Sequence, residues 1–462
     1  MKLYNTKTRS KEDFIPLQEG QLKLYACGPT VYNYFHIGNA RAFIIFDVVR
    51  RYFEYLGYEV SYVQNITDID DKIIEQAISE HRDFHEIADK YATAFLEDCA
   101  MLGIKPPTHQ PRATHVMPQI IALIDTLVQK GHAYEVDGDV YFDTASLPEY
   151  GSLSGKQIED QMTGARVAEN TQKKHPADFT LWKKSKPGEP VWQSPWGEGR
   201  PGWHTECVVM SQHYLGESFD IHGGGIDLVF PHHENENAQA MALTGKPLAR
   251  YWMHNGFLNI EGEKMSKSLK NFFTARDILE EYDAEVIRFF FLSKHYRSPI
   301  DFTRELIEES GKALQNFYKA LSSVDFLSLK RTEITLSEIL DVEKGFRDAM
   351  DDDFNSAKAI ALLFDLAHRI RDARQEQTHR EEAALMLVKL GKVLGFFQNL
   401  QSRLQDNMHD LSKQLIDLIL GYRKEARANK DWALSDRLRD DLLALGIVIN
   451  DSPGGSTWEL RN

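Results

Sequence analysis

Residues 21–39 read QLKLYACGPTVYNYFHIGN, and this stretch, with the segments that follow it, decides the fold. Leucine and alanine alternate with lysine and tyrosine over 22–26, which predicts a β-strand that ends at the Gly-Pro pair of 28–29. An apolar stripe at helical spacing follows over 39–56, and a second strand is predicted over 60–63. Strand, glycine-containing loop, helix and strand in this order predict an α/β, doubly wound Rossmann-type domain that binds a nucleotide.

The length of 462 residues, at about 150 residues per domain, predicts roughly three domains rather than one. Fifteen of the sixteen prolines stand at or before Pro299, so the stretch that follows lacks helix breakers and is expected to be mostly helical. Residues 145–205 are rich in glycine, proline, lysine and tryptophan, and we interpret them as an irregular part of an insertion over about 100–205. The expected domains are an α/β domain over 1–300, a helical bundle over 301–400 and a small C-terminal domain over 401–462.

The amino-acid composition excludes several classes of protein. Hydrophobic residues make up 42% of the chain and charged residues 27%, which excludes a fibrous or largely disordered protein. A net charge of −15 excludes a uniformly cationic surface but still permits a local basic strip that binds nucleic acid. The three cysteines are too few for a disulfide framework and fit a reducing, cytoplasmic compartment. No targeting segment or membrane span is expected, because no apolar run approaches the roughly 20 residues that a span needs.

Two short motifs are typical of phosphate-binding sites. Residues 36–39 (HIGN) stand where the loop enters the helix, and a helix N-terminus offers free backbone N–H groups and a partial positive charge. Residues 264–268 (KMSKS) follow a strand predicted over 257–260, and their two lysines offer cationic donors to a polyphosphate during nucleotidyl transfer. The alternatives are a tight turn for the first motif and a solvated basic turn for the second.

A third set of residues has the chemistry of a metal site. Cys27 ends the first strand, and Cys207 and a pair of histidines at 232–233 lie far along the chain. Glu236 can share a helix face with either histidine, because residues three or four apart are neighbours on a helix. Two thiolates, one imidazole and one carboxylate make a plausible tetrahedral zinc set. The alternative is a pair of buried cysteines with a hydrogen-bonded histidine and surface carboxylates.

The two phosphate motifs together resemble those of class I aminoacyl-tRNA synthetases. Within that class the chain resembles the cysteinyl-tRNA synthetase family over essentially its full length. The strings that carry this resemblance, in family order, are residues 27–32 (CGPTVY), 65–72 (NITDIDDK), 202–207 (GWHTEC), 220–227 (DIHGGGID) and 230–236 (FPHHENE). One departure is Asn39, which stands where the class usually has a second histidine, so this side chain can donate a hydrogen bond but cannot carry charge.

The resemblance implies a role for each residue at a matching position. It selects His232 over its neighbour, so the implied zinc ligands are Cys27, Cys207, His232 and Glu236. The implied ATP-binding residues are His36, Gly38, Asn39, His222, Gly224, Asp227, Lys264 and Lys267. Among these, the implied catalytic residues are His36, Asn39, Lys264 and Lys267. Thr67 and Trp203 match positions that line the pocket for the amino acid, whereas Cys99 matches no ligand and is expected in the core.

The C-terminal end carries a local excess of basic residues. Residues 423–439 have a charge balance of +3 around a tryptophan, and a nucleic-acid base can stack on such a ring. A solvated helix face with one packed tryptophan is the alternative. The resemblance implies an anticodon-binding domain here, with Arg427, Trp432 and Asp436 as the expected contacts, and a DALR-like helical bundle before it.

The resemblance implies an enzyme that activates L-cysteine with ATP and passes the cysteinyl group to the terminal adenosine of tRNA(Cys). The expected cofactors are one Zn²⁺ per chain, which selects the thiolate, and Mg²⁺ bound with ATP. A monomer in the cytoplasm is expected. Two alternatives remain: a cysteine ligase that acts on an amino-sugar acceptor, and a non-catalytic, zinc-stabilised RNA-binding protein.

Overall fold

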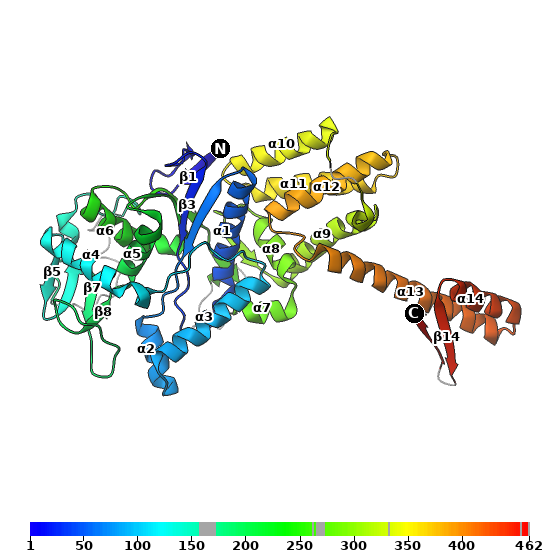
Figure 1. Cartoon of the computed structure of the whole chain (residues 1–462), viewed down its shortest axis with the longest axis horizontal. Helices are drawn as coiled ribbons and strands as arrows, with labels where there is room; N and C mark the ends of the chain where they lie inside the picture. Colours follow the sequence, from blue (N-terminus) through cyan, green and yellow to red (C-terminus); the bar gives the residue numbers. More distant parts are fainter. Residues whose placement is uncertain (157–171, 261–262, 265–272, 331–332, 453–454, 461–462) are drawn as a thin grey trace. The chain divides into compact units, whose positions relative to one another are not determined.

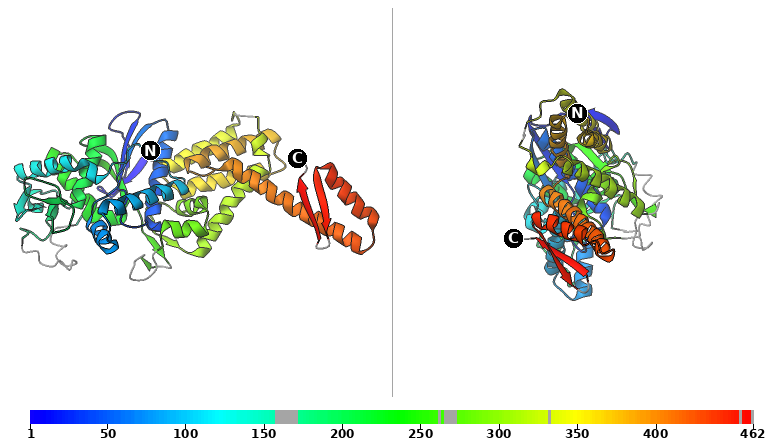
Figure 2. Two further views of the ribbon diagram at one scale, coloured as in Figure 1. Left: turned by 60° about the horizontal axis from the view of Figure 1, so that its bottom comes forward. Right: turned by 90° about the vertical axis from the view of Figure 1, so that its right-hand side faces the viewer.

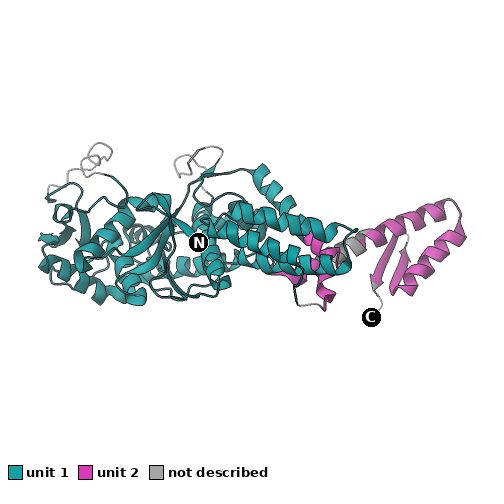
Figure 3. Cartoon of the chain, turned by 90° about the horizontal axis from the view of Figure 1, so that it is seen from above, with its two compact units in different colours: residues 1–317, 331–398 teal, residues 318–330, 399–462 magenta. Residues whose placement is uncertain are grey.

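The computed structural model describes residues 1–156, 172–260, 263–264, 273–330, 333–452 and 455–460. The chain forms two compact units, one of residues 1–317 with 331–398 and one of residues 318–330 with 399–462 (Figure 3). Most of the expected helical bundle therefore belongs to the same unit as the α/β domain. The division into three domains at residues 300 and 400 stays a prediction.

The first unit is built around a parallel sheet with the strand order β10-β9-β3-β4. Figure 1 labels its strand β3 and the helix α1 that follows this strand. Its strands are β3 (Gln21–Ala26), β4 (Glu59–Gln64), β9 (Phe219–Gly225) and β10 (Ala249–Asn255), and α1 (Ile37–Tyr55) connects β3 to β4. The predicted Rossmann-type start of the fold is confirmed. Because β4 and β9 lie on opposite sides of β3, the carboxyl ends of β3 and β9 border the crevice in which such sheets bind ligands.

The segment between β4 and β9 contains the expected insertion, whose bounds of about 100–205 stay a prediction. Its helices are α2 (Asp71–Glu80), α3 (Phe84–Met101) and α4 (Met117–Gln129), with short 3-10 turns over Ala113–Val116 and Thr144–Ser146. Its strands, in the order β5-β6-β7-β8, are β5 (Ala133–Val136), β6 (Asp139–Phe142), β7 (Phe179–Lys184) and β8 (Gly199–Pro201). The chain then returns to the parallel sheet through α5 (Trp203–Leu215), and α6 (Glu234–Thr244) follows β9.

The interpretation of residues 145–205 as irregular is wrong where β7 and β8 lie. Leu181 and Trp182 on β7 are completely buried, so tertiary packing rather than local composition fixes this strand. Gly199 on β8 packs tightly against the Trp182 ring. A Cβ atom at this position would stand 2.2 Å from the Trp182 Nε1 atom. The glycine that looks like a loop residue in the sequence therefore permits a close approach between two strands.

The C-terminal part of the first unit is helical, as predicted. A small sheet is formed by β11 (Leu258–Ile260) and β12 (Glu263–Lys264), which precede the first of these helices, and by β13 (Ile300–Phe302), which follows the second. The helices are α7 (Ala275–Glu281), α8 (Ala284–Leu292), α9 (Arg304–Ser322), α10 (Ser337–Asp351), α11 (Ser356–Arg371) and α12 (Gln377–Val393). Leu363, Ala367 and Ile370 form a fully buried stripe on α11, which matches the helical spacing of the sequence.

An N-terminal hairpin of β1 (Lys2–Asn5) and β2 (Ser10–Asp13) is attached to the edge of the parallel sheet at β10. The backbone N–H of Thr6 donates to the carbonyl oxygen of Trp252 at 2.9 Å, and the buried Asn5 side chain donates to that of Arg250 at 3.1 Å. The hairpin therefore protects an edge strand of the sheet that would otherwise present unpaired backbone groups.

The second unit contains α13 (Leu400–Ala428), α14 (Trp432–Ala444) and the hairpin β14 (Ile447–Ser452) with β15 (Gly455–Leu460) (Figure 2). The 3-10 turn Phe326–Ser328 belongs to its other segment. Its small core contains Ile416, Leu442 and Ile447, and the buried Arg423 donates to both carboxylate oxygens of Asp451 at 2.7 and 2.8 Å. No helix in the described part of the chain is long and apolar enough to cross a membrane.

A buried arginine on α1 joins the two halves of the α/β fold. Arg41 is fully buried and donates to four backbone carbonyl oxygens: Gly256 and Phe257 at 2.8 Å each, Tyr296 at 3.1 Å and Ser298 at 2.6 Å. These carbonyl groups lie in the loops that follow β10 and precede β13. The single side chain therefore adds four hydrogen bonds to carbonyl groups of these loops and fixes the loops beside the sheet's carboxyl end.

We expect Arg41→Ala to lower the free energy of unfolding by at least about 3 kcal/mol, because four charge-assisted hydrogen bonds would be lost and a cavity would replace a fully buried side chain. Arg50→Ala, on the same helix, is the control and should cost about 1 kcal/mol or less, since Arg50 forms a part-exposed ion pair with Glu54. Urea unfolding followed by circular dichroism measures both values. Equal costs for the two variants would contradict this view of Arg41.

Candidate active site

One cavity of about 410 Å³ opens at the carboxyl ends of β3 and β9. It lies where a doubly wound sheet is expected to bind its ligand. Its lining includes nine of the residues that the sequence predicts for the site: Cys27, His36, Gly38, Asn39, Trp203, Cys207, Gly224, Asp227 and His232. The predicted metal ligands and the predicted nucleotide-binding residues therefore face a common space, although they come from segments far apart in the chain.

Two glycines let the backbone form part of this cavity's wall. A Cβ atom on Gly28 would lie 1.7 Å from the carbonyl oxygen of Asn65, so only glycine allows the end of β3 to approach the loop after β4. A Cβ atom on Gly224 would lie 2.8 Å from the His233 ring. The glycines of β9 thus reflect close packing in a strand, rather than a flexible turn.

The N-terminus of α1 faces the cavity. His36 is the N-cap of this helix, and its Nδ1 atom accepts a hydrogen bond from the backbone N–H of Asn39 at 3.3 Å. In the neutral ring this leaves the proton on Nε2, which can donate to a phosphate. Lys72, which sequence reasoning did not single out, also lines the cavity, with its ammonium 5.3 Å from the centre of the Tyr32 ring.

The second phosphate motif lies largely outside the described residues. The backbone of Lys264 belongs to β12, which pairs with β11, but its side chain and all of Lys267 are outside the described part. Their predicted contact with ATP stays a prediction. β11 itself is placed beside the cavity, since Leu258 lines it.

Four predicted metal ligands converge at one end of the cavity. The Cys27 and Cys207 sulfurs, the His232 ring and the Glu236 carboxylate each offer an atom, and these atoms lie within 4.8 Å of one another. Cys27 follows β3, Cys207 lies on α5, and the other two flank the start of α6. The His232 Nε2 and Glu236 Oε1 atoms are 2.7 Å apart, as the spacing of four residues on a helix allows.

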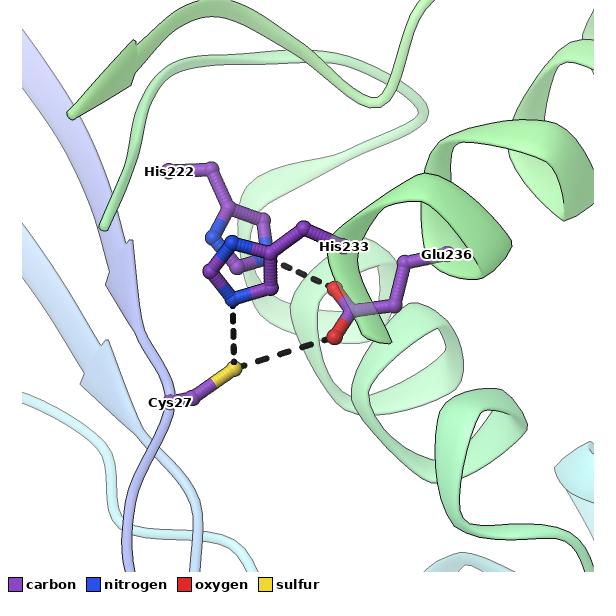
Figure 4. Close-up of side chains that lie close together, drawn as sticks. All are labelled: Cys27, His222, His233 and Glu236. Atoms are coloured by element: carbon purple, nitrogen blue, oxygen red, sulfur yellow. Dashed lines mark hydrogen bonds and ion pairs between the residues drawn. The ribbon is translucent and has the colours of Figure 1, made fainter. Parts of the chain in front are cut away.

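A second set of donors shares two members with the first. Cys27, His222, His233 and Glu236 also offer atoms within 4.8 Å of one another (Figure 4). The His222 Nε2 atom lies 2.6 Å from Glu236 Oε2, and the His233 Nε2 atom lies 3.3 Å from the Cys27 sulfur. From geometry alone, either Cys207 with His232 or His222 with His233 can complete a metal site around Cys27 and Glu236.

The cluster favours a bound cation. A hydrogen bond from Cys27, assisted by His232, lowers the pKa of the Cys207 thiol to about 6 against the raising effect of burial. Burial alone raises the pKa of Glu236, but the imidazoles of His232 and His222 hold it well below its usual value. Burial by itself lowers the pKa of His232, and Glu236 with Cys207 raises it to about 10. The Cys207 thiolate and the Glu236 carboxylate thus both interact with the His232 imidazolium. A divalent cation can supply the positive charge in place of the imidazolium proton.

Comparisons with known proteins match the whole chain. Residues 13–312 match the model of the class I (C) tRNA synthetase catalytic domain, residues 345–398 the DALR domain, and residues 409–458 the cysteinyl-tRNA ligase anticodon-binding domain. A cysteine–tRNA ligase of Clostridioides difficile strain 630 is 49% identical over 99% of this chain and 100% of its own. One from Pelobacter propionicus is 48% identical over the full length of both chains. The chain belongs to the cysteine–tRNA ligase family of class I aminoacyl-tRNA synthetases.

Solved structures support the fold of this ligase. The methionyl-tRNA synthetase of Mycobacterium tuberculosis, in complex with methionyl-adenylate, has a TM-score of 0.58 at 15% identity over 81% of this chain and 89% of its own. A LeuRS–tRNA–LeuAMS ternary complex from Agrobacterium radiobacter K84 has a TM-score of 0.61 at 12% identity over 83% and 84% of the two chains. At these identities the likeness concerns the class I architecture alone.

Two of the predicted site residues, His222 and Thr67, do not line the cavity, and their contacts with ATP and cysteine stay predictions. His222 was expected to bind ATP, but its side chain is completely buried against Glu236 and does not line the cavity. Thr67 was expected to line the pocket for cysteine, but it is buried and accepts a hydrogen bond from the Asn65 amide at 3.1 Å. In both cases the local sequence predicts a residue near the site, but the direction of the side chain depends on tertiary packing.

Sequence reasoning also missed the groups that hold the ligands of this ligase. The His204 Nδ1 and His232 Nδ1 atoms are hydrogen-bonded at 2.8 Å, and the Trp203 ring stacks on the His232 ring with centres 3.9 Å apart. Burial, with the neighbouring His232, lowers the pKa of His204 to about 3, so His204 is neutral and can accept the Nδ1 proton. This contact leaves the Nε2 atom of His232 directed at the cluster. The sequence feature that points to His204 is the GWHTEC string, in which His204 stands close to two predicted site residues.

We expect the purified protein to contain about one zinc ion per chain, and His232→Ala to remove most of it. His233→Ala is a matched control, because its imidazole belongs to the other donor set and should be dispensable for the ion. Elemental analysis of desalted protein measures the metal, and circular dichroism verifies that each variant is folded. Zinc that is retained in His232→Ala and lost in His233→Ala would assign the ion to the second set.

Proposed function

We propose that this ligase forms cysteinyl-adenylate from L-cysteine and ATP and then transfers the cysteinyl group to the 3′-terminal adenosine of tRNA(Cys). This proposal rests on one observation: metal-binding donors and a phosphate-binding helix N-terminus line the same cavity. Cys27, Cys207 and His232 line one end, and the N-terminus of α1 with His36 and Asn39 lines the other. A cysteine whose thiol lies at the first end would direct its carboxylate toward a nucleotide phosphate at the second.

A zinc ion fits the donors at the first end. Two sulfurs, one imidazole and one carboxylate are ligand types that zinc prefers, and their atoms lie within 4.8 Å of one another. We infer that Cys27, Cys207, His232 and Glu236 hold the ion. When bound, zinc supplies a soft Lewis acid that favours the sulfur of cysteine over the oxygen of serine.

In the first proposed step the cysteine carboxylate attacks the α-phosphate of ATP, a new C–O–P bond forms, and pyrophosphate leaves. The free N–H groups of α1 and the His36 ring bind the phosphates, and the Asn39 amide donates a hydrogen bond. Lys72 adds a positive charge at the same wall. Lys264 and Lys267 are proposed to neutralise the leaving pyrophosphate, together with Mg²⁺ bound with ATP.

In the second proposed step a ribose hydroxyl of the terminal adenosine attacks the adenylate carbonyl, the acyl–phosphate bond breaks, and AMP leaves. Asp227 lines the cavity beside the bare backbone of Gly224 and Gly225 and is proposed to accept hydrogen bonds from the ribose of the nucleotide. The proton of the attacking hydroxyl can pass to the departing phosphate oxygen. Trp203, stacked on His232, is proposed to form the wall of the pocket for the cysteine side chain.

We expect cysteine to support exchange of label between ATP and pyrophosphate at least about 10⁴-fold better than serine, because the site reads a group that serine lacks. His232→Ala should lower exchange with cysteine much more than His233→Ala does. Both amino acids are assayed side by side with zinc quantified in the same sample. Comparable exchange with serine would contradict selection by the sulfur.

The second unit is proposed to bind the anticodon of tRNA(Cys). Trp432 at the start of α14 is 58% exposed, so a base can reach its ring, and the alternative of a packed tryptophan does not apply. Arg427 pairs with Asp451 at 3.0 Å and Asp436 with Arg439 at 3.5 Å, so these two predicted contacts already have ionic partners. Trp432 is therefore the strongest of the three predicted contacts. A match to an anticodon-binding domain disfavours an amino-sugar acceptor.

We expect Trp432→Ala to raise the KM for tRNA(Cys) about 5-fold or more, since stacking on an aromatic ring contributes about 1–3 kcal/mol per base. Leu445→Ala is the control: this apolar side chain is 75% exposed just after the same helix but offers no ring. Aminoacylation at varied tRNA concentration measures KM, and the exchange reaction without tRNA checks that the catalytic unit is intact. An unchanged KM for Trp432→Ala would exclude a stacking role.

A further inference from the structure

The turn between α10 and α11 carries a buried carboxylate that the proposed reaction does not use. Asp353 is completely buried, although it stands in a run of three aspartates over 351–353. Its Oδ1 atom accepts hydrogen bonds from the backbone N–H of Tyr4 at 2.9 Å and from the Tyr296 hydroxyl at 2.8 Å, and its Oδ2 atom accepts one from the Arg297 Nε atom at 2.7 Å. A buried charge with several donors is a fixed point to which separate segments of the chain are attached.

The backbone of this turn is strained. Asp353 has a φ of 61° and Phe354 a φ of 51°, and a bulky residue such as phenylalanine rarely adopts this left-handed conformation. The Phe354 ring is buried, and its centre lies 6.0 Å from that of the Tyr52 ring on α1. A strained turn persists only where its contacts outweigh the strain, and such turns are concentrated at functional positions. The contacts of Asp353 and Phe354 thus hold an unfavourable conformation in which the carboxylate reaches the loop between α8 and β13.

The residues that Asp353 holds stand directly behind the wall of the candidate active-site cavity. The Tyr296 hydroxyl contacts Asp353, and the Tyr296 carbonyl oxygen accepts a hydrogen bond from the backbone N–H of Gly256 at 2.9 Å. Gly256 lines the cavity. A Cβ atom on Gly256 would lie 2.6 Å from the carbonyl oxygen of Arg297, so the two backbones are in close contact. One residue, Tyr296, therefore joins the buried carboxylate to the cavity wall.

The same loop leads into a strand of the small sheet that carries the start of the second phosphate motif. The backbone N–H of Ile300 on β13 donates to the carbonyl oxygen of Phe257 at 3.1 Å, and β13 pairs in parallel with β11. Leu258 on β11 lines the cavity. β11 in turn pairs with β12, where Lys264 begins the second phosphate motif. A shift of the loop would therefore move β11 and, with it, the backbone of Lys264.

We propose that Asp353 is a positioning residue for ATP, because through Tyr296 it fixes the cavity wall at Gly256 and the strands that lead to Lys264. The inference rests on the proposed function, in which the nucleotide binds between the N-terminus of α1 and the second phosphate motif. Asp353 lies within residues 345–398, which match the DALR domain, so the helical bundle shapes the nucleotide site without touching the substrate. The four proposed zinc ligands come from other segments of the fold, so the site for the cysteine thiol should be affected much less.

The experiment uses the full chain with the variants Asp353→Ala, Tyr296→Phe and the two combined. Tyr296→Phe removes only the hydroxyl that contacts Asp353 and leaves the backbone contacts of this residue in place. Glu382→Gln is the matched control, because Glu382 is an equally buried carboxylate of the same bundle and accepts hydrogen bonds from two backbone N–H groups just before α10 at 2.8 Å each. ATP–pyrophosphate exchange gives the KM for ATP and for cysteine, urea unfolding gives the stability, and elemental analysis gives the zinc content.

Asp353→Ala should raise the KM for ATP about 10-fold, while the KM for cysteine changes less than about 2-fold, because a small displacement of a positioned wall weakens only the binding that depends on it. Its zinc content should equal that of the parent. Tyr296→Phe should raise the KM for ATP by a smaller factor. The double variant should be no worse than Asp353→Ala, since both changes break the same connection. Glu382→Gln should lower the free energy of unfolding but leave both KM values unchanged.

Three outcomes would overturn the inference. An unchanged KM for ATP in Asp353→Ala at reduced stability would show that the carboxylate is only structural, equal increases in both KM values would indicate a general distortion of the cavity, and additive effects in the double variant would separate the two residues. If Asp353→Ala does not fold, Tyr296→Phe decides, because a KM for ATP equal to that of the parent would refute the proposal. Absence of exchange in the parent itself would refute the proposed function instead, so the two failures are distinguishable.

Discussion

The buried carboxylate of Glu236 is the constraint on which the site depends. It is completely buried, and its two oxygens lie 2.7 Å from His232 and 2.6 Å from His222. An ionised carboxylate in such a place is tolerated only when charged or hydrogen-bonding partners compensate for its lost hydration. The partners come from β9 and from the turn before α6, so Glu236 fixes both segments relative to the end of β3, where Cys27 stands. Removing this group would leave imidazoles and thiols gathered without the acceptor that orients them.

Local patterns predicted the parts of this site that a short segment determines. The strand over 22–26, the helix that follows it and the position of His36 at the start of that helix depend on alternation, helical spacing and a helix N-terminus, all of which the sequence displays. The direction of His222 could not be predicted in this way, because a side chain on a buried strand can face either side of the sheet. β7 was missed for a related reason: its strand character depends on burial of Trp182 against residues distant in the sequence.

The choice between His232 and His233 illustrates the same limit at the scale of one residue. Both are fully buried, and each can reach a donor set that includes Cys27 and Glu236. Their second ring nitrogens separate them: His232 contacts His204 at 2.8 Å, whereas His233 contacts His254 at 2.7 Å, which in turn contacts Thr6 at 2.7 Å. The tautomer of each ring, and hence the atom it can offer to an ion, is set by these outer partners. The spacing of residues in the sequence therefore does not show which ring nitrogen of each histidine is available to an ion.

Three consecutive residues of α6 connect the candidate metal centre to the insertion. Glu234 accepts hydrogen bonds from the backbone N–H groups of Gly151 and Ser154 at 3.0 and 2.7 Å, Asn235 accepts one from Tyr150 at 2.7 Å, and Glu236 belongs to the donor cluster. The contacts of Glu234 and Asn235 fix the turn of the chain that carries Tyr150 and Ser154. The spacing between the donor cluster and that turn is therefore set by one helix rather than by a loop. A cluster whose donors come from distant segments gains precision when one regular element both contributes a donor and is fixed to the neighbouring part of the fold.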